Sequence, residues 1–155
     1  MLVVKSNLAN TYQKLGRLDE ALRVQKGVYF GRLRLDGEED VETLREANNY
    51  AWNLVNAQRF EEAKALLRKP LPVAQRVLGE SHELTLKMRW GYAGALYKET
   101  SATLDDLREA VTTLEETERA ARRVLGGAHP LTEAIERHVG KSRAALRARE
   151  TPPST

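Results

Sequence analysis

The stretch SNLANTYQKLGRLDEA at residues 6–21 returns as NNYAWNLVNAQRFEEA at residues 48–63. Ala9 in the first copy corresponds to Ala51 in the second, at a spacing of 42 residues. A third, longer copy, RWGYAGALYKETSATLDDLREA, occupies residues 89–110. A pattern that repeats at such a period is typical of proteins in which each unit is one supersecondary element stacked on the next. The sequence therefore predicts an array of similar units.

A second repeated pattern fixes the register of these units. LGESHELT at residues 78–85 recurs as LGGAHPLT at residues 125–132, and a degraded version, DGEEDVET, stands at residues 36–43. The third copy is five residues longer than the others, and its segment TSATLDD supplies residues suited to a turn and a helix cap. A fourth copy begins at His129 and holds one helix only, so we count three and a half units.

Each unit has the pattern of two helices. In the first unit Leu8, Tyr12 and Leu15 recur at helical spacing, and Gly16 ends the run. Alanine returns at a fixed place in each helix, where a small side chain allows two helices to approach closely. No segment alternates as a strand would, so the predicted fold is all-α. The expected helices cover residues 3–15, 18–34, 41–57, 60–78, 82–98, 105–125 and 130–148.

The fourth of these helices contains Lys69-Pro70-Leu71-Pro72. A proline inside a helix removes a hydrogen bond and clashes with the preceding turn, at a cost of about 3 kcal/mol. We therefore expect the helix to break near Arg68 and to resume toward Val77. The break is either a kink that packing tolerates or a bend that reshapes a binding surface.

Length and composition bound the function. A chain of 155 residues predicts one domain, here residues 1–148, followed by a polar, proline-rich tail at residues 149–155 that should be disordered. The chain has no cysteine, no long apolar run and no basic leader, so we expect a cytoplasmic protein without a membrane segment. A net charge of +3 from 25 basic and 22 acidic residues does not favour nucleic acid as a partner.

No arrangement of residues suggests catalysis, a cofactor or a metal. His82 and His129 occupy the same repeat position ahead of a helix, which favours a structural role in the turn. Metal sites need converging ligands, and no such spacing of histidines and carboxylates occurs. Paired acids such as Asp105-Asp106 are typical of a solvated helix face. We therefore predict that the protein is not an enzyme and uses no cofactor.

The repeat resembles the tetratricopeptide repeat in its long form, the form of the kinesin light chains. The likeness rests on Leu8-Ala9-x-x-Tyr12-x-x-x-Gly16-x-x-Asp19-Glu20-Ala21, on the following Leu-Gly-x-x-His-x-x-Thr, and on the 42-residue spacing. It covers roughly residues 3–147. The resemblance implies a right-handed helical solenoid with a concave, peptide-binding groove. The heptad coiled coil of the kinesin light chains has no counterpart here, so their cargo recognition is not carried over.

By this resemblance, one face of the first helix of each unit lines the groove. Its residues are amides, amines, one guanidinium and one tryptophan, without a carboxylate, which suits a groove that holds peptide backbone and prefers acidic side chains. The predicted peptide-binding residues are Asn7, Asn10, Lys14, Arg45, Asn49, Trp52, Asn56, Lys87, Lys98 and Lys141. The alternative is an ordinary solvated helix face on which asparagine is common.

Two other features leave alternatives open. Gly91 and Gly94 on the third unit's face predict either a shallow bay for a bulky ligand group or close packing of that helix on a neighbour. The first helix carries Val3, Val4 and Leu8 without a polar capping unit, which indicates either a fragment of a longer array or a surface for a partner, including self-association. The predicted function is an adaptor for a protein or peptide partner, most simply an acidic one; the alternative is a structural spacer that binds nothing in its groove.

Overall fold

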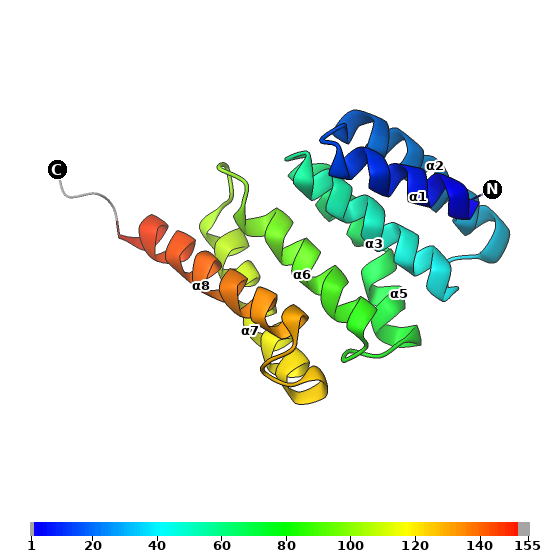
Figure 1. Ribbon diagram of the computed structural model, residues 1–155. Coiled ribbons are helices and arrows are strands. Elements are labelled where there is room, and N and C mark those ends of the chain that lie inside the picture. The colour runs from blue at the N-terminus through cyan, green and yellow to red at the C-terminus, as the bar shows by residue number, and fades with distance from the viewer. Residues whose placement is uncertain (1, 152–155) are drawn as a thin grey trace. The chain divides into compact units, whose positions relative to one another are not determined.

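The computed structural model describes residues 2–151, apart from the side chain of Gln13. These residues form helices and no strand (Figure 1). The helices are α1 (Leu2–Lys14), α2 (Leu18–Asp36), α3 (Val41–Asn56), α4 (Phe60–Leu67), α5 (Pro70–Val77), α6 (Glu83–Tyr97), α7 (Leu104–Leu125) and α8 (Pro130–Glu150). The all-α prediction is confirmed, with each expected helix in place and the fourth one divided into α4 and α5.

The chain forms two compact units, Met1–Gly79 and Glu80–Thr155. In the first unit α2 packs against both α1 and α3, and α3 also packs on α4 and α5. In the second unit α7 packs against both α6 and α8. We call α1, α3, α6 and α8 the A-type helices, since each is the first helix of a repeat, and α2, α4–α5 and α7 the B-type helices.

The repeated alanines stand in the contacts between helices. All six have no exposed surface, as a small residue at a close helix–helix approach requires. They are Ala9, Ala21, Ala51, Ala63, Ala93 and Ala110. In the second unit Ala93 and Ala110 share one core with Leu114 and Ile135. The repeat register read from the sequence is therefore confirmed.

Three side chains at one repeat position start the A-type helices α3, α6 and α8. Asp40 Oδ1 accepts a hydrogen bond from the Glu42 N–H at 2.9 Å. His82 Nδ1 and His129 Nδ1 accept in the same way from the N–H groups of the residues two positions later, at 3.1 and 3.0 Å. Each bond satisfies an amide that the helix itself leaves unpaired. The structural role predicted for His82 and His129 is confirmed.

The turns that lead into these caps need a left-handed backbone. Gly37, Gly79 and Gly126 occupy one repeat position and have φ of +86°, +98° and +90°. Glycine adopts this conformation without steric cost, which explains why it recurs there even where the rest of the pattern is degraded. The turn between the A-type and B-type helices is similar, with Gly16 at +75° in the first unit and Gln58 at +61° in the second.

The extra residues of the third repeat lie between α6 and α7, as predicted. Thr103 and Asp106 close them with a capping box, in which Thr103 Oγ1 accepts from the Asp106 N–H at 3.0 Å and Asp106 Oδ2 accepts from the Thr103 N–H at 2.9 Å. Both bonds satisfy amides at the start of α7. The insertion therefore ends in a well-defined helix start.

The helix break predicted near Arg68 is confirmed. α4 ends at Leu67 and α5 begins at Pro70, which stands at the first helical position. Proline is tolerated there because the first turn of a helix leaves its N–H groups without internal partners. The helix resumes at once and continues through Val77.

The C-terminal end differs slightly from the prediction. Arg149 and Glu150 were expected in a disordered tail, but α8 continues through both, and the Thr151 N–H donates to the Arg147 carbonyl at 2.9 Å. The basic residues near the end of α8 are favourable beside its carbonyl groups, which supports the extra half turn. Residues 152–155 of the predicted tail lie outside the described residues.

Candidate peptide-binding site

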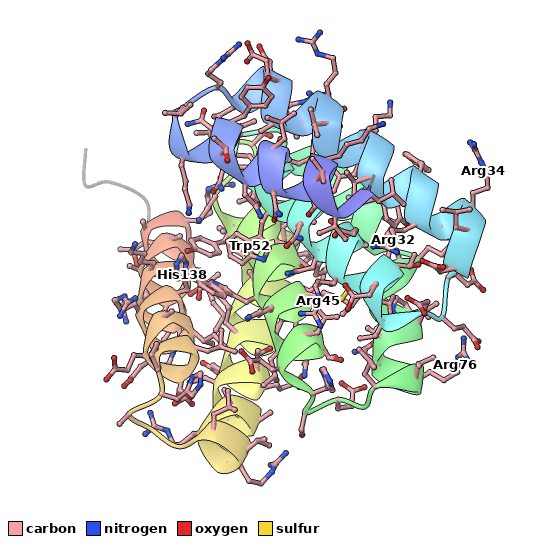
Figure 2. All side chains as sticks on the ribbon, turned by 45° about the vertical axis from the view of Figure 1, so that its right-hand side comes forward. Arg32, Arg34, Arg45, Trp52, Arg76 and His138 are labelled. Carbon is pink, nitrogen blue, oxygen red and sulfur yellow. The ribbon has the colours of Figure 1, made fainter. Side chains whose placement is uncertain are left out.

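The predicted site divides between the two units. In the first unit α1 and α3 lie side by side (Figures 1 and 2), joined by the hydrogen bond from Ser6 Oγ to Glu46 Oε1 at 3.2 Å. This pair carries what we call the first-unit face: Asn7, Asn10, Lys14, Arg45, Asn49, Trp52 and Asn56. In the second unit α6 and α8 are in contact and carry the second-unit face: Lys87, Lys98, His138 and Lys141.

Most of the first-unit face is open to solvent. Asn7, Asn10 and Lys14 on α1 are exposed, as are Arg45 and Asn56 on α3. Trp52 is half-buried and lies on the same helix as Arg45, as Figure 2 shows. Exposed amides can offer both a donor and an acceptor to a peptide bond. The structure therefore brings the predicted amides of α1 and α3 together on adjacent helices.

A buried carboxylate supports this face from beneath. Glu46 on α3 is 6% exposed and accepts hydrogen bonds from Gln25 Nε2 on α2 at 2.6 Å and from Ser6 Oγ on α1. Asn49 Nδ2 donates to the same carboxylate at 3.4 Å. A buried charge is tolerated when it is hydrogen-bonded in this way. Glu46 thus links three helices and holds Asn49, one of the predicted contacts.

The chosen face positions hold no carboxylate, but carboxylates border them. Besides Glu46, Glu42 Oε2 lies 3.5 Å from Arg45 Nε, and Glu83 Oε1 lies 3.2 Å from Lys87 Nζ. The reason is helical geometry: side chains three or four residues apart are neighbours, so acids just outside the chosen positions reach the cations on it. Both ion pairs are solvent-exposed, and each contributes about 0–1 kcal/mol to stability. An acidic group of a ligand can therefore replace the glutamate beside either cation at low cost.

The second-unit face is built around His138, which the predicted site omitted. Its ring lies 5.2 Å from the Trp90 ring and 6.0 Å from the Tyr97 ring, both on α6, measured between centroids. The Tyr97 hydroxyl and His138 Nδ1 also share a hydrogen bond. His138 stands 47 residues after Gly91, at the spacing between the third and fourth repeats, and this spacing places it on the face.

Burial and charge set the protonation of this pair. Burial lowers the pKa of His138 to about 4, assisted by the positive charges of Lys98, Lys141 and Arg137. Burial also raises the pKa of Tyr97 to about 12. At neutral pH the imidazole is therefore neutral and the phenol protonated, and the two groups share one hydrogen bond.

Two lysines beside His138 lack acidic partners. Burial lowers the pKa of Lys98, and the charge of Lys141 lowers it further. Within residues 2–151, neither lysine forms an ion pair with a carboxylate. Two cations that repel each other without a counter-charge favour an anion between them. The second-unit face is therefore where the predicted preference for acidic groups has its strongest electrostatic support.

The glycines on α6 do not form an open bay. Gly91 and Gly94 are both buried, and a Cβ atom added at Gly94 would lie 3.9 Å from Lys98 Cε. The Lys98 side chain thus covers the surface that the bay would need. Lys98 directly follows α6, and no atom of another helix lies within 4 Å of the Cβ position at Gly94, so close packing on a neighbouring helix does not explain this glycine either.

A cavity in the first unit lies apart from the predicted site residues. A cavity of about 310 Å³ in the first unit is lined by side chains of α2, α3, the following turn and α4, and none of these is a predicted site residue. They are Asp19, Leu22, Arg23, Lys26, Tyr50, Arg59 and Glu62. Over the part of the chain that the structure describes, no three His, Cys, Asp or Glu side chains gather to hold a metal ion. No described helix is long and apolar enough to span a membrane.

Comparison with known proteins agrees with this architecture. The family described as Tetratricopeptide repeat matches residues 2–29 and 43–83. Two crystal structures of nearly identical TPR-like repeats of a putative kinesin light chain from Podosopora anserina superpose with TM-scores of 0.76 and 0.73. Each is 21% identical and covers 96% of this chain and 68% of the other.

A crystal structure of BtubC (BKLC) from P. vanneervenii is also similar, with a TM-score of 0.60 and 18% identity, covering 99% of this chain and 67% of that one. The search of curated proteins gives no match to the sequence. The repeat match and the shared fold agree with the internal 42-residue period, the alanine positions and the capped A-type helices. Residues 2–29 and 43–83 thus match the tetratricopeptide repeat, and the chain shares the fold of the solved kinesin light chain-like repeats.

Proposed function

We propose that the chain is a non-enzymatic adaptor that binds an acidic peptide segment on the faces of its A-type helices. The tetratricopeptide fold is, in general, a scaffold for protein–protein interaction. The observation that carries the finer proposal is the pair Lys98 and Lys141, which stand together on the second-unit face without acidic partners among the described residues. An acidic side chain of a ligand would supply the missing counter-charge.

The first-unit face supports the same proposal through its amides. Asn7, Asn10 and Asn56 are exposed and can each bond both the N–H and the C=O of an extended peptide. Arg45 adds a cation that is held only by an exposed contact with Glu42 at 3.5 Å. Backbone contacts give affinity with little sequence selectivity, whereas the cations select acidic side chains. We expect modest affinity, since an extended peptide loses conformational freedom when it binds.

The N-terminal repeat supports a partner at a second surface. Val4 on α1 is 69% exposed and Leu8 is 41% exposed, so the self-association predicted for this repeat has an apolar surface available to it. This surface points in another direction from the amides of the first-unit face. Val4 and Leu8 each follow a position of that face, Val3 and Asn7, and one residue along a helix turns the side-chain direction by about 100°.

The test is a titration of acidic and basic peptide libraries against the wild type, Asn49→Ala and Arg45→Glu. Acidic peptides should bind the wild type in preference to basic ones. Arg45→Glu should abolish that preference on the first-unit face. Asn49→Ala should weaken the binding of acidic and basic peptides alike. Trp52 reports occupancy, because a ligand beside its half-buried ring should change its fluorescence.

The outcome also separates the adaptor from the spacer. A spacer would bind no peptide with either face, and Arg45→Glu would then leave every measurement unchanged. An adaptor without acidic preference would bind both libraries equally. Circular dichroism of each variant is the control for folding, since Arg45 is exposed and its substitution should leave helix content intact.

A further inference from the structure

The cavity of about 310 Å³ in the first unit is lined by charged side chains that the proposed peptide-binding faces do not use. We call it the α2–α4 cavity and define it by its lining residues Asp19, Leu22, Arg23, Lys26, Tyr50, Arg59 and Glu62. Its volume is at the lower end of the range for small-ligand sites in proteins, about 300–1,000 Å³. The α2–α4 cavity therefore has room for one small ligand or one side chain of a partner.

Two cations of α2 reach this cavity without an acidic partner. Arg23 and Lys26 are exposed and stand three residues apart, so they lie on the same side of the helix. Among the described residues, neither forms an ion pair with a carboxylate. Asp19 also lines the cavity, and it stands in the first turn of α2, where the positive end of the helix favours a carboxylate. The cations of α2 therefore outnumber its acid at the cavity.

Arg59 brings a further cation from the turn before α4. Its Nε and Nη2 both donate to the Glu62 carboxylate, Nη2 at 2.6 Å, whereas Nη1 donates to no described residue. The hydrogen bonds from Arg59 lower the pKa of Glu62, and the positive charge of Lys26 lowers it further. The side chains of α2 and α4 are therefore within electrostatic reach of each other, and Arg59 can offer Nη1 to a ligand without releasing Glu62.

The Tyr50 hydroxyl adds a neutral donor. Tyr50 is half-buried, and its hydroxyl forms no hydrogen bond within the described part of the chain. Its counterpart 42 residues later, Tyr92, is hydrogen-bonded to Glu109 Oε1 at 3.3 Å. Glu62 corresponds to Glu109 at the spacing of 47, but its carboxylate is held by Arg59. The first repeat thus leaves at the cavity a hydroxyl whose counterpart is paired within the protein.

We propose that the α2–α4 cavity binds a phosphate monoester, with Arg23, Lys26, Arg59 Nη1 and the Tyr50 hydroxyl as donors. A phosphate monoester carries a charge of about −1.5 to −2 at pH 7 and three strong acceptor oxygens. Donors from α2, α3 and the turn before α4 can each meet a different oxygen of such a tetrahedral group. A carboxylate has only two oxygens in one plane. The site is separate from the peptide-binding faces, so the two proposals can fail independently.

The test is a titration of the isotope-labelled chain with glycerol 3-phosphate, followed by its amide chemical shifts. Glycerate is the matched control ligand, because it carries a carboxylate in place of the phosphate ester. The amides that surround the α2–α4 cavity should shift and saturate, with a Kd on the order of 1 mM, whereas the amides of Lys98 and Lys141 should not shift. Glycerate should bind at least about tenfold more weakly.

Four variants test the assigned donors. Arg23→Gln should weaken the binding of glycerol 3-phosphate about tenfold, since it removes a charge-assisted hydrogen bond. Tyr50→Phe should weaken it several-fold while keeping the ring beside Tyr29. Asp19→Asn should strengthen it, because the lining loses a negative charge. Arg34→Gln is the matched control: it removes an exposed cation of α2 that does not line the cavity, and it should bind as the wild type does.

A second titration identifies the source of the phosphate group. It uses a synthetic peptide with one phosphoserine and the same peptide with serine, and binding is measured at the amides around the cavity. If the phosphopeptide binds more tightly than glycerol 3-phosphate, the group comes from a partner protein; if it binds more weakly, the group comes from a small molecule.

Three results would overturn the proposal. The first is the absence of a shift around the α2–α4 cavity with glycerol 3-phosphate up to about 10 mM. The second is equal affinity for glycerate and glycerol 3-phosphate. The third is equal affinity of Arg23→Gln and Arg34→Gln for glycerol 3-phosphate. The amide spectrum of each variant verifies that it is folded.

Discussion

The repeated alanines show how one small residue sets the distance between helices. Ala51 and Ala93 have no exposed surface, and Ala93 shares one core with Leu107 and Ala110 of α7, the B-type helix of its own repeat. A larger side chain there has no space without moving a backbone. Because this constraint acts on one position in every repeat, the sequence alone was sufficient to find it.

Ala51→Leu or Ala93→Leu should lower the free energy of unfolding by about 1–3 kcal/mol, since overpacking forces side chains off their rotamers or shifts the helix. Urea unfolding followed by circular dichroism measures the change. Ala65→Leu is the matched control, because Ala65 is exposed on α4. Equal midpoints for Ala51→Leu, Ala93→Leu and the control would contradict the packing described here.

His138 makes stability depend on pH. Its pKa is lowered from 6.5 to about 4 in the folded chain, so between these values the unfolded chain binds a proton that the folded chain does not. The free energy of unfolding should therefore be fully retained above about pH 6.5 and fall as the pH drops toward 4. The loss is on the order of 1 kcal/mol once solvent screening at this half-exposed ring is allowed for.

The comparison with His138→Gln isolates this residue from the carboxylates that titrate in the same range. The difference in free energy of unfolding between wild type and variant should be constant above pH 7 and should shift against the wild type below about pH 6.5. Tyr97, Trp90 and the cations Lys98, Lys141 and Arg137 surround the ring and stay unchanged in both proteins. A difference independent of pH would show that His138 titrates as a solvated histidine.

Sequence reasoning missed contacts between distant residues. Glu46 is held by Gln25 and Ser6, which precede it by 21 and 40 residues, and His138 bonds to Tyr97, 41 residues earlier. Neither contact follows from helical spacing within one segment. The histidine caps, in contrast, depend on one repeat position and a bond to an amide two residues later, which local sequence specifies.

At the scale of helices, α3, α6 and α8 start in the same way. Asp40, His82 and His129 accept the same backbone hydrogen bond, at 2.9–3.1 Å, with two different chemical groups. The position thus requires an acceptor of suitable reach rather than a particular residue. The same hydrogen bond forms at Asp40 although the repeated sequence has changed there, which explains why DGEEDVET still starts a helix.

His129→Ala should lower the free energy of unfolding by about 1 kcal/mol, because it leaves the Leu131 N–H without its 3.0 Å partner. His129→Asp should retain most of the stability, as Asp40 accepts the equivalent bond. Thermal or urea unfolding distinguishes the two variants. If His129→Ala and His129→Asp lose the same free energy, the imidazole acts through packing and the cap is unimportant.

Helix boundaries were predicted where a local residue sets them and less well elsewhere. Gly16, Gly126 and the prolines of α5 each restrict the backbone directly, so the corresponding ends agree with the structure. The end of α8 was placed early, since composition was read as disorder although the helix continues to Glu150. The acids that neighbour Arg45 and Lys87 were overlooked because only every third or fourth residue was considered.

For the molecule as a whole, repetition provides two similar faces, one in each compact unit, with different chemistry. The first-unit face offers exposed amides over a buried carboxylate, and the second offers two lysines beside a neutral histidine. The fold was predictable because every repeat carries the same packing pattern. The ligand was not, because the face residues are the ones that vary between repeats while the core residues recur.

The most direct test of the proposed function measures one acidic peptide, selected from the library, by calorimetry against Lys141→Gln and Arg34→Gln. Each variant loses one exposed cation, Lys141 from the second-unit face and Arg34 from α2. Lys141→Gln should bind several-fold more weakly than the wild type, with a reduced dependence on salt, whereas Arg34→Gln should bind as the wild type does. Equal affinities for the two variants, or a basic peptide that binds the wild type as tightly, would contradict the assignment of an acidic ligand to these faces.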